Sequence, residues 1–226
     1  MVDLHLLCLP GKQDIRYILD AARTCLAAQA EPTVAYLPAA AVGYDWLDYT
    51  EKAFAGLAAL AYIGTETMPL DDIAAILDRA GLVYISGGNT FLLNHRLHRS
   101  GVLDLLRQKV LDGLPVVAFS AGTTLCGPNI LTSNDINMCA TTHFTALNLT
   151  PFNFSVHYPS EESARTETDA WLSGYHVYHG NPILALEDDA YLRVHDGEAV
   201  LVRGNGWLLK KGQPRQKVTP GRPIRP

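Results

Sequence analysis

The sequence predicts an α/β protein, a three-layer sandwich in which a mostly parallel sheet carries helices on both faces. The first observation behind this prediction is that short apolar runs alternate with longer segments in which apolar residues recur at helical spacing. Such alternation produces βαβ units with right-handed crossovers, and therefore parallel strands covered by helices. The second is that 226 residues, 48% of them hydrophobic and 18% charged, suit one large globular domain.

The N-terminal quarter supplies two predicted strands and two predicted helices. Residues 4–9 are nearly all apolar and stop at a Pro-Gly pair, which is typical of a buried strand followed by a turn. Residues 15–26 place apolar side chains on one helical face and charges on the other. A second strand is predicted at 34–37. The alanine- and leucine-rich stretch 49–60 predicts a second helix.

The next quarter repeats this alternation with clearer signals. Residues 71–80 form an amphipathic pattern that predicts a helix. The run 82–85 contains β-branched residues and ends at a Ser-Gly-Gly sequence, so it predicts a buried strand. Residues 91–111 predict one long helix, and 115–119 predict another buried strand. Because consecutive parallel strands end at the same edge of a sheet, we expect the segments that follow them to lie together.

The second half is less regular. We expect a short strand at 154–158, a helix at 161–172 and a strand at 183–186. Gly-containing turns separate three further strands that are expected to form a meander, at 191–194, 199–202 and 207–210.

The predicted domain organisation is simple. Residues 1–211 are expected to form a single α/β domain. Residues 212–226 are rich in proline and in basic residues and are expected to form a mobile tail without regular structure.

Composition excludes several classes of function. Eighteen basic and 23 acidic residues give a net charge of −5, which argues against a general nucleic-acid-binding protein. The sequence shows neither a signal peptide nor an apolar stretch long enough to cross a membrane, so a cytoplasmic protein without membrane partners is expected. The cysteines are scattered, which predicts neither a zinc knuckle nor a disulfide framework; they are Cys8, Cys25, Cys126 and Cys139.

A candidate nucleophile follows the predicted strand at 115–119. Ser120 stands in an Ala-x-Ser-x-Gly sequence, with small residues at Ala118, Ala121 and Gly122. In serine hydrolases a tight strand-to-helix turn with small neighbours pushes the serine hydroxyl out into the crevice. The alternative is a serine that caps the N-terminus of a helix, and this short sequence alone does not separate the two interpretations.

A candidate oxyanion hole follows the strand at 82–85. The glycines of Gly87-Gly88-Asn89-Thr90 allow backbone N–H groups to approach a ligand closely. In a hydrolase the amide of Gly88 would join that of Ala121 in stabilising the oxyanion. The alternative is a tight turn before a helix cap. The loop matches neither common phosphate-binding glycine pattern.

A serine nucleophile needs a base, and a histidine base needs an acid that fixes its tautomer. Among eight histidines, His157 is distinguished because it lies at the end of a short predicted strand that stops at a proline. Three acids follow the strand at 183–186: Glu187, Asp188 and Asp189. Their alternative interpretation is a solvated acidic turn.

These segments together resemble the peptidase E (α-aspartyl dipeptidase) family, whose wider relatives include cyanophycinase. The matching stretches are Gly87-Gly88-Asn89-Thr90-Phe91, Phe119-Ser120-Ala121-Gly122, Thr132-Ser133-Asn134-Asp135, His157-Tyr158 and Trp46-Leu47-Asp48-Tyr49-Thr50. The order and spacing of segments up to about residue 211 are also similar. The resemblance implies a flavodoxin-like sandwich, as in class I glutamine amidotransferases.

The resemblance also implies roles for individual residues. Ser120 would be the nucleophile, His157 the general base and Asp188 the acid, with Asp189 or Glu187 as possible substitutes. Arg165 matches an arginine of the family and would bind the aspartate side chain of the substrate; the alternative is a solvated arginine on the helix surface. Asp135 would hold the substrate ammonium or brace the site, and Asn89 would orient the substrate.

The implied activity is hydrolysis of Asp-Xaa dipeptides through an acyl-serine intermediate, without a metal or other cofactor. The expected partner is a small peptide with an N-terminal aspartate, and a homodimer is possible. Alternatives are a cyanophycinase-like or other acyl hydrolase that uses the same triad, or a non-catalytic module that binds a small anion. A glutaminase is disfavoured because the elbow carries serine, and Cys126 lies six residues too late.

Overall fold

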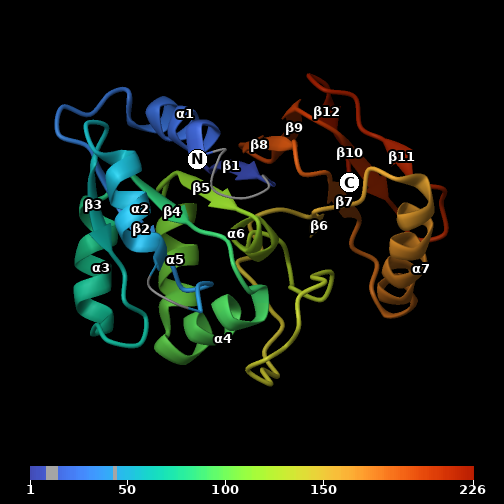
Figure 1. The fold of residues 1–226 in the computed structure, drawn as a ribbon, viewed down its shortest axis with the longest axis horizontal. Helices are drawn as coiled ribbons and strands as arrows, with labels where there is room; N and C mark the ends of the chain where they lie inside the picture. Colours follow the sequence, from blue (N-terminus) through green and yellow to red (C-terminus); the bar gives the residue numbers. More distant parts are fainter. Residues whose placement is uncertain (9–14, 43–44) are drawn as a thin grey trace.

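A computed structural model gives the structure of the protein and describes residues 1–8, 15–42 and 45–226. Within these residues the main sheet has eight strands in the order β12-β9-β8-β1-β5-β4-β2-β3 (Figure 1). The strands β1, β5, β4, β2 and β3 are parallel, and β8, β9 and β12 are antiparallel. Their bounds are β1 Asp3–Leu7, β2 Thr33–Leu37, β3 Ala59–Tyr62, β4 Leu82–Ile85, β5 Val116–Phe119, β8 Tyr191–His195, β9 Glu198–Arg203 and β12 Pro223–Ile224.

Helices cover both faces of the main sheet, because successive side chains of each buried strand point to opposite sides. Leu82 and Tyr84 of β4 pack with helices α1 and α2, whereas Val83 and Ile85 pack with the four helices on the other face. The three-layer prediction is therefore confirmed. The helices are α1 Ile15–Leu26, α2 Asp45–Phe54, α3 Leu70–Arg79, α4 Thr90–Ser100, α5 Val102–Leu111 and α6 Ala121–Leu125.

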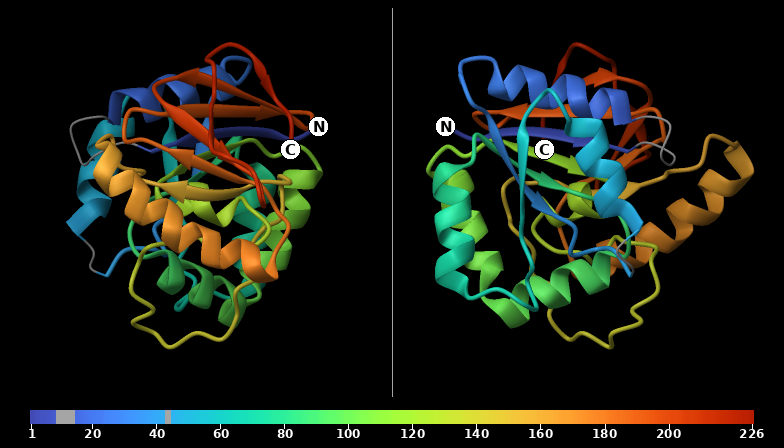
Figure 2. Two further views of the ribbon diagram at one scale, coloured as in Figure 1. Left: turned by 90° about the vertical axis from the view of Figure 1, so that its right-hand side faces the viewer. Right: turned by 60° about the vertical axis from the view of Figure 1, so that its left-hand side comes forward.

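A second sheet lies beside the C-terminal strands of the main sheet, which are β8, β9 and β12 (Figure 2). Its order is β11-β10-β7-β6, with β6 (Asn153–Val156) parallel to β7 (Ile183–Leu186). One face joins the main core, and the other packs under α7 (Glu162–Tyr178) through Ile183 and Ala185. The remaining strands are β10 (Gly206–Leu209) and β11 (Gln216–Lys217).

Two predictions for the first half are wrong. The single helix expected at 91–111 is two helices, because Gly101 adopts a left-handed conformation (φ 73°) that ends α4 before α5 begins. The helix expected at 49–60 ends at Phe54, and Ala59–Tyr62 forms strand β3 instead. This strand lies at the sheet edge and is largely half-buried. Its alanine-rich sequence shows no alternation of apolar and polar residues, so it gives no signal of a strand.

The second half contains two further corrections. The last strand of the expected meander, β10, pairs with β7 of the second sheet, so the meander has only β8 and β9. The segment 212–226, expected to lack regular structure, contributes a strand to each sheet: β11 pairs with β10, and β12 pairs with β9. Backbone pairing to strand edges needs no hydrophobic run, which is why composition did not reveal these two-residue strands.

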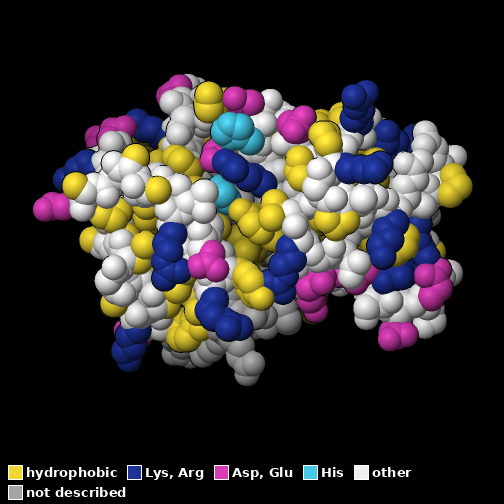
Figure 3. Space-filling model, turned by 90° about the horizontal axis from the view of Figure 1, so that it is seen from above, with side chains coloured by type: hydrophobic (Ala, Val, Ile, Leu, Met, Phe, Trp, Pro, Cys, Tyr) yellow, Lys and Arg dark blue, Asp and Glu magenta, His cyan; other side chains and the backbone are white. Residues whose placement is uncertain are grey.

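The surface shows charges of both signs. On the face drawn in Figure 3, Lys and Arg side chains are scattered among Asp and Glu side chains and form no continuous stripe. Among the described residues no helix has both the length and the apolar character that a membrane span requires.

A buried histidine predicts that stability depends on pH. Burial lowers the pKa of His5, whose Nδ1 bonds the hydroxyl of Tyr191; Asp3 favours the charged ring, and Arg193 opposes it. As the pH falls, His5 in the unfolded chain therefore binds a proton before His5 in the folded protein does. The free energy of unfolding should decrease below about pH 6.5, by at most about 1.4 kcal/mol per pH unit. Chemical denaturation of the wild type and His5→Gln between pH 7 and 5 should show a flatter profile for the variant. Equal slopes for the wild type and His5→Gln would contradict this prediction.

Candidate active site

Ser120 occupies a strained turn between β5 and α6. Its backbone has φ 53° and ψ −108°, a conformation that L residues rarely adopt, and its side chain makes no capping hydrogen bond to the helix. Small neighbours permit this turn: a Cβ on Gly122 would lie 2.6 Å from the backbone oxygen of Ile85. The sequence-based alternative of a helix-capping serine is thus excluded. The hydroxyl is left available to groups from other strands.

His157 reaches Ser120 from the second sheet. It follows β6 in a left-handed conformation (φ 57°), and its backbone N–H donates to Sγ of Cys8 at 3.0 Å. Ring Nε2 lies 2.8 Å from Oγ of Ser120, a normal hydrogen-bond distance. The side chain is 37% exposed, so a substrate and water can reach it.

Asp188 lies on the other side of the histidine ring. Its Oδ1 is 2.5 Å from Nδ1 of His157, which is short for a hydrogen bond and typical of a charged acceptor. The structure therefore places a hydroxyl, an imidazole and a carboxylate in one hydrogen-bonded line. In such an arrangement the carboxylate holds the tautomer in which Nε2 can accept the hydroxyl proton.

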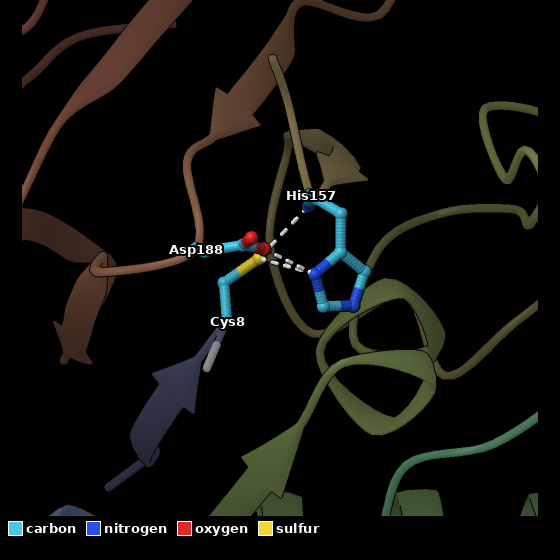
Figure 4. A group of neighbouring side chains, drawn as sticks. All are labelled: Cys8, His157 and Asp188. Atoms are coloured by element: carbon cyan, nitrogen blue, oxygen red, sulfur yellow. Dashed lines mark hydrogen bonds and ion pairs between the residues drawn. The ribbon is translucent and has the colours of Figure 1, made fainter. Parts of the chain in front are cut away.

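Strand pairing brings these residues together. In the second sheet Val156 pairs with Leu186, so the residues just after the two strands are neighbours. In the main sheet β1 and β5 are adjacent and parallel, so Cys8 and Ser120 each lie one residue beyond paired strand ends. Figure 4 shows the side chains of Cys8, His157 and Asp188 converging from three strands. The site is thus built at the carboxyl edges of both sheets.

The geometry separates the three adjacent acids. Glu187 is buried and its Oε1 lies 2.6 Å from Nη2 of Arg165. Asp189 points elsewhere and accepts the backbone N–H of Asn205 at 3.1 Å. Asp188 is the member of the triplet that contacts the histidine, which favours it over the two alternatives as the acid.

Arg165 links three segments that surround the site. Besides its ion pair with Glu187, it donates from Nε to the backbone oxygen of Pro159 at 2.8 Å and packs over the Trp207 ring. These contacts tie the segment after His157 to the segment that carries the acid. Since Glu187 neutralises the guanidinium, the prediction that Arg165 binds a substrate carboxylate gains no support from this geometry.

The other two predicted substrate residues organise the loop after β4. Asn89 caps α4: its Oδ1 accepts the N–H of Leu92, and its Nδ2 donates to the backbone oxygen of Ile136, both at 2.9 Å. Asp135 Oδ2 accepts the N–H of Thr90 at 2.7 Å. Both side chains therefore hold the Gly-Gly loop and the chain around residue 135 against the helix start, which agrees with a bracing role for Asp135.

The predicted oxyanion amides lie at the ends of two neighbouring strands. Gly88 has φ 143°, and a Cβ there would lie 2.2 Å from the backbone oxygen of Ala40, so only glycine fits. Ala121 is the first residue of α6, where helical N–H groups have no partner within the helix. Within the described part of the chain, neither amide has a hydrogen-bond acceptor.

Cys8 is the site residue that sequence reasoning missed. Its Sγ accepts the N–H of His157 and donates to the backbone oxygen of Leu186 at 3.4 Å. Burial raises the pKa of this thiol far above its usual value, so it is neutral. Cys8 lies within the apolar run 4–9 that predicts the first strand, where it has the character of an ordinary apolar residue. The local sequence therefore gives no sign that Cys8 contacts His157.

Comparison with protein families identifies the chain. The model of peptidase family S51 matches residues 8–202, a range that contains Ser120, His157 and Asp188. The chain belongs to peptidase family S51. The resemblance to peptidase E is thereby confirmed.

Several relatives of this S51 peptidase carry the name peptidase E or alpha-aspartyl dipeptidase. It is 31% identical over 201 residues to "Peptidase E" of Shewanella sp. (strain W3-18-1), covering 86% of this chain and 84% of that protein. It is 36% identical over 163 residues to the "Probable alpha-aspartyl dipeptidase" of Drosophila melanogaster, covering 70% and 67%. A crystal structure of a "Putative Peptidase E Protein" from Listeria monocytogenes EGD-e has a TM-score of 0.72 and 20% identity, over 90% of this chain and 99% of that one.

Proposed function

We propose that this S51 peptidase is a serine dipeptidase that hydrolyses the bond after an N-terminal aspartate. The observation that carries the proposal is the continuous line Ser120 Oγ, His157 Nε2, His157 Nδ1 and Asp188 Oδ1, with separations of 2.8 and 2.5 Å. A hydroxyl that is hydrogen-bonded to an oriented imidazole is the arrangement that activates a serine as a nucleophile.

The mechanism follows from these positions. Ser120 attacks the peptide carbonyl as His157 takes its proton, and Asp188 stabilises the imidazolium that forms. The amides of Gly88 and Ala121 stabilise the oxyanion, each contributing about 3 kcal/mol to the transition state. His157 then gives its proton to the leaving amine. It next activates a water molecule, which releases the aspartate from the acyl-serine.

The aspartate specificity rests on the named relatives. The Drosophila relative is named an alpha-aspartyl dipeptidase, and the segments that carry the proposed triad lie inside the family match. An N-terminal aspartate needs a cationic partner for its side chain and an anionic or carbonyl partner for its ammonium group. Arg165 and Glu187 near the site are held in one ion pair, so recognition of the substrate would use groups other than these two.

Covalent labelling tests the acyl-serine mechanism. A fluorophosphonate reacts with activated serines, so incubation should add one label to Ser120, located by peptide mass spectrometry. His157→Ala should abolish labelling because the hydroxyl then loses its base. Stoichiometric labelling elsewhere, with Ser120 unmodified, would rule out this mechanism.

A matched pair of dipeptides tests the specificity. Asp-Leu and Asn-Leu differ only by a charged oxygen in place of an amide nitrogen. The ratio of their kcat/KM values should favour Asp-Leu by at least about 100-fold, because a site built for a carboxylate leaves groups unpaired with the amide. Equal values would contradict aspartate specificity, and faster cleavage of β-Asp-Arg would favour the cyanophycinase-like alternative.

Arg96 is expected to support the oxyanion loop indirectly. Its Nη1 donates to the backbone oxygens of Ala39 and Ala41, at 3.0 and 2.7 Å, and thereby fixes Ala40, on which Gly88 packs. Arg96→Gln should lower kcat about tenfold with little change in KM, because complete loss of one oxyanion donor lowers it about 100-fold or more.

Arg107 provides the matched control for this prediction. Its Nε likewise donates to a loop carbonyl, that of Leu147 at 3.0 Å, whereas the atoms nearest to a Cβ on Gly88 all belong to Ala40. Steady-state kinetics of Arg107→Gln should match the wild type. A similar fall in kcat for both variants would show a general effect of lost loop anchoring, and the proposed link to Gly88 would be wrong.

A further inference from the structure

Three potential metal ligands meet at the back of the histidine ring. Among the described residues, donor atoms of Cys8, His157 and Asp188 all lie within 4.8 Å of one another (Figure 4). The sulfur is 4.0 Å from Nδ1, and Nδ1 is 2.5 Å from the carboxylate. These residues come from three separate strands, and a thiol is not required for the hydrolysis proposed above.

The donor set suits a thiophilic divalent cation. Zinc binds thiolate sulfur at about 2.3 Å, imidazole nitrogen at about 2.0 Å and carboxylate oxygen at about 2.1 Å, usually with four ligands. Two of its ligands therefore lie about 3 to 4 Å apart, which matches the separation of the sulfur and Nδ1. The Asp188 side chain is 52% exposed and has room to move outward as the ion enters. Water from the exposed side would complete the tetrahedron.

We propose that Cys8, His157 and Asp188 form an inhibitory site for Zn²⁺ or a similar thiophilic cation that competes with the triad hydrogen bond. Binding to Nδ1 displaces the proton that Nδ1 shares with Asp188, and the ring keeps one proton, now on Nε2. The Cys8 thiol releases its proton to solvent as the sulfur binds the ion. Nε2 then donates to Ser120 instead of accepting from it, so the serine loses its base.

Proton release makes the inhibition depend on pH. In the metal-free protein the Cys8 thiol donates its proton to the backbone oxygen of Leu186, and sulfur binds a metal ion as the thiolate, so each bound ion must displace this proton. One proton released per ion means that the inhibition constant falls about tenfold for each rise of one pH unit above neutrality. This slope distinguishes binding through the thiol from binding to His157 and Asp188 alone, which releases no thiol proton.

Cadmium binding tests whether the Cys8 sulfur is a metal ligand, and it requires no enzyme activity. Cd²⁺ added to the Ser120→Ala protein should produce the ultraviolet charge-transfer band of a cadmium thiolate, with one ion per chain. The band should be absent from Ser120→Ala/Cys8→Ser and retained in Ser120→Ala/Cys139→Ser, where a half-buried cysteine outside the site is changed. A band that persists without Cys8, or that disappears with Cys139, would overturn the proposal.

Inhibition gives the second test, and this arm rests on the proposed function. Each variant is compared with its own rate in a chelator. Zn²⁺ should inhibit the wild type reversibly, and Cys8→Ser should raise the inhibition constant at least about tenfold, as expected when a ligand is lost. Equal inhibition constants for the two proteins would contradict the proposal.

If Cys8→Ser does not fold, the dependence of the wild-type inhibition constant on pH tests the proposal instead, and an inhibition constant that does not change with pH would overturn it. A protein that binds Cd²⁺ through Cys8 but shows no peptidase activity would refute the proposed function alone.

Discussion

Replacing Ser120 with alanine is expected to lower kcat on an Asp-Xaa substrate by at least about 1,000-fold. In the proposed mechanism the hydroxyl forms the covalent bond to the substrate, and removal of a triad nucleophile leaves only the residual catalysis of the oxyanion hole and of substrate binding. Single-turnover and steady-state assays with Asp-p-nitroanilide would measure the loss.

The fold should survive this change. Ser120 Oγ bonds the ring of His157 and caps no helix, and alanine can occupy the same backbone conformation with similar strain. Thermal unfolding of Ser120→Ala should therefore follow that of the wild type. Ser160→Ala, which changes an exposed serine near the site, is the control and should keep full activity. Equal rates for Ser120→Ala and the wild type would refute the assignment of the nucleophile.

Asp188→Asn is expected to lower kcat by about 1,000- to 10,000-fold. The amide of asparagine can donate a hydrogen bond to Nδ1, which favours the tautomer with its proton on Nε2. That tautomer cannot accept the proton of Ser120. The amide also provides no negative charge to stabilise the imidazolium. Because the histidine no longer starts in the productive tautomer, the loss should appear in kcat more than in KM, as measured by steady-state kinetics.

The neighbouring acid supplies a matched control. Asp189→Asn makes the same chemical change one residue later, where the carboxylate accepts the N–H of Asn205. Since an asparagine oxygen can also accept this bond, activity should stay within a few-fold of the wild type. If Asp189→Asn were inactive and Asp188→Asn active, the acid would be assigned to the wrong member of the triplet.

The side chains of Ser120, His157 and Asp188 gather at strand ends, which are easy to locate in a sequence. Buried strands have continuous apolar runs, and Ser120, His157 and Asp188 each follow one of them. The second sheet was not foreseen, since β10 has the same local sequence character whether it pairs with β9 or with β7. The partner of a strand depends on contacts between segments that are distant in the chain.

The roles of Arg165 and Cys8 show a different limit. A charged residue in a helix and a cysteine in an apolar run carry no local sign of what they touch. Arg165 bonds Glu187 only because helix α7 packs beside the end of β7. Cys8 contacts His157 only because the two sheets meet at this edge. Such contacts depend on tertiary packing, which a single sequence does not reveal.

The proposed nucleophile stands on one sheet, and its proposed base and acid stand on the other. The alignment of the hydroxyl with the ring therefore depends on how the two sheets pack against each other, and the C-terminal segment adds one strand to each sheet. Removing the last residues of the polypeptide is consequently expected to slow turnover, although every group in the crevice stays chemically intact.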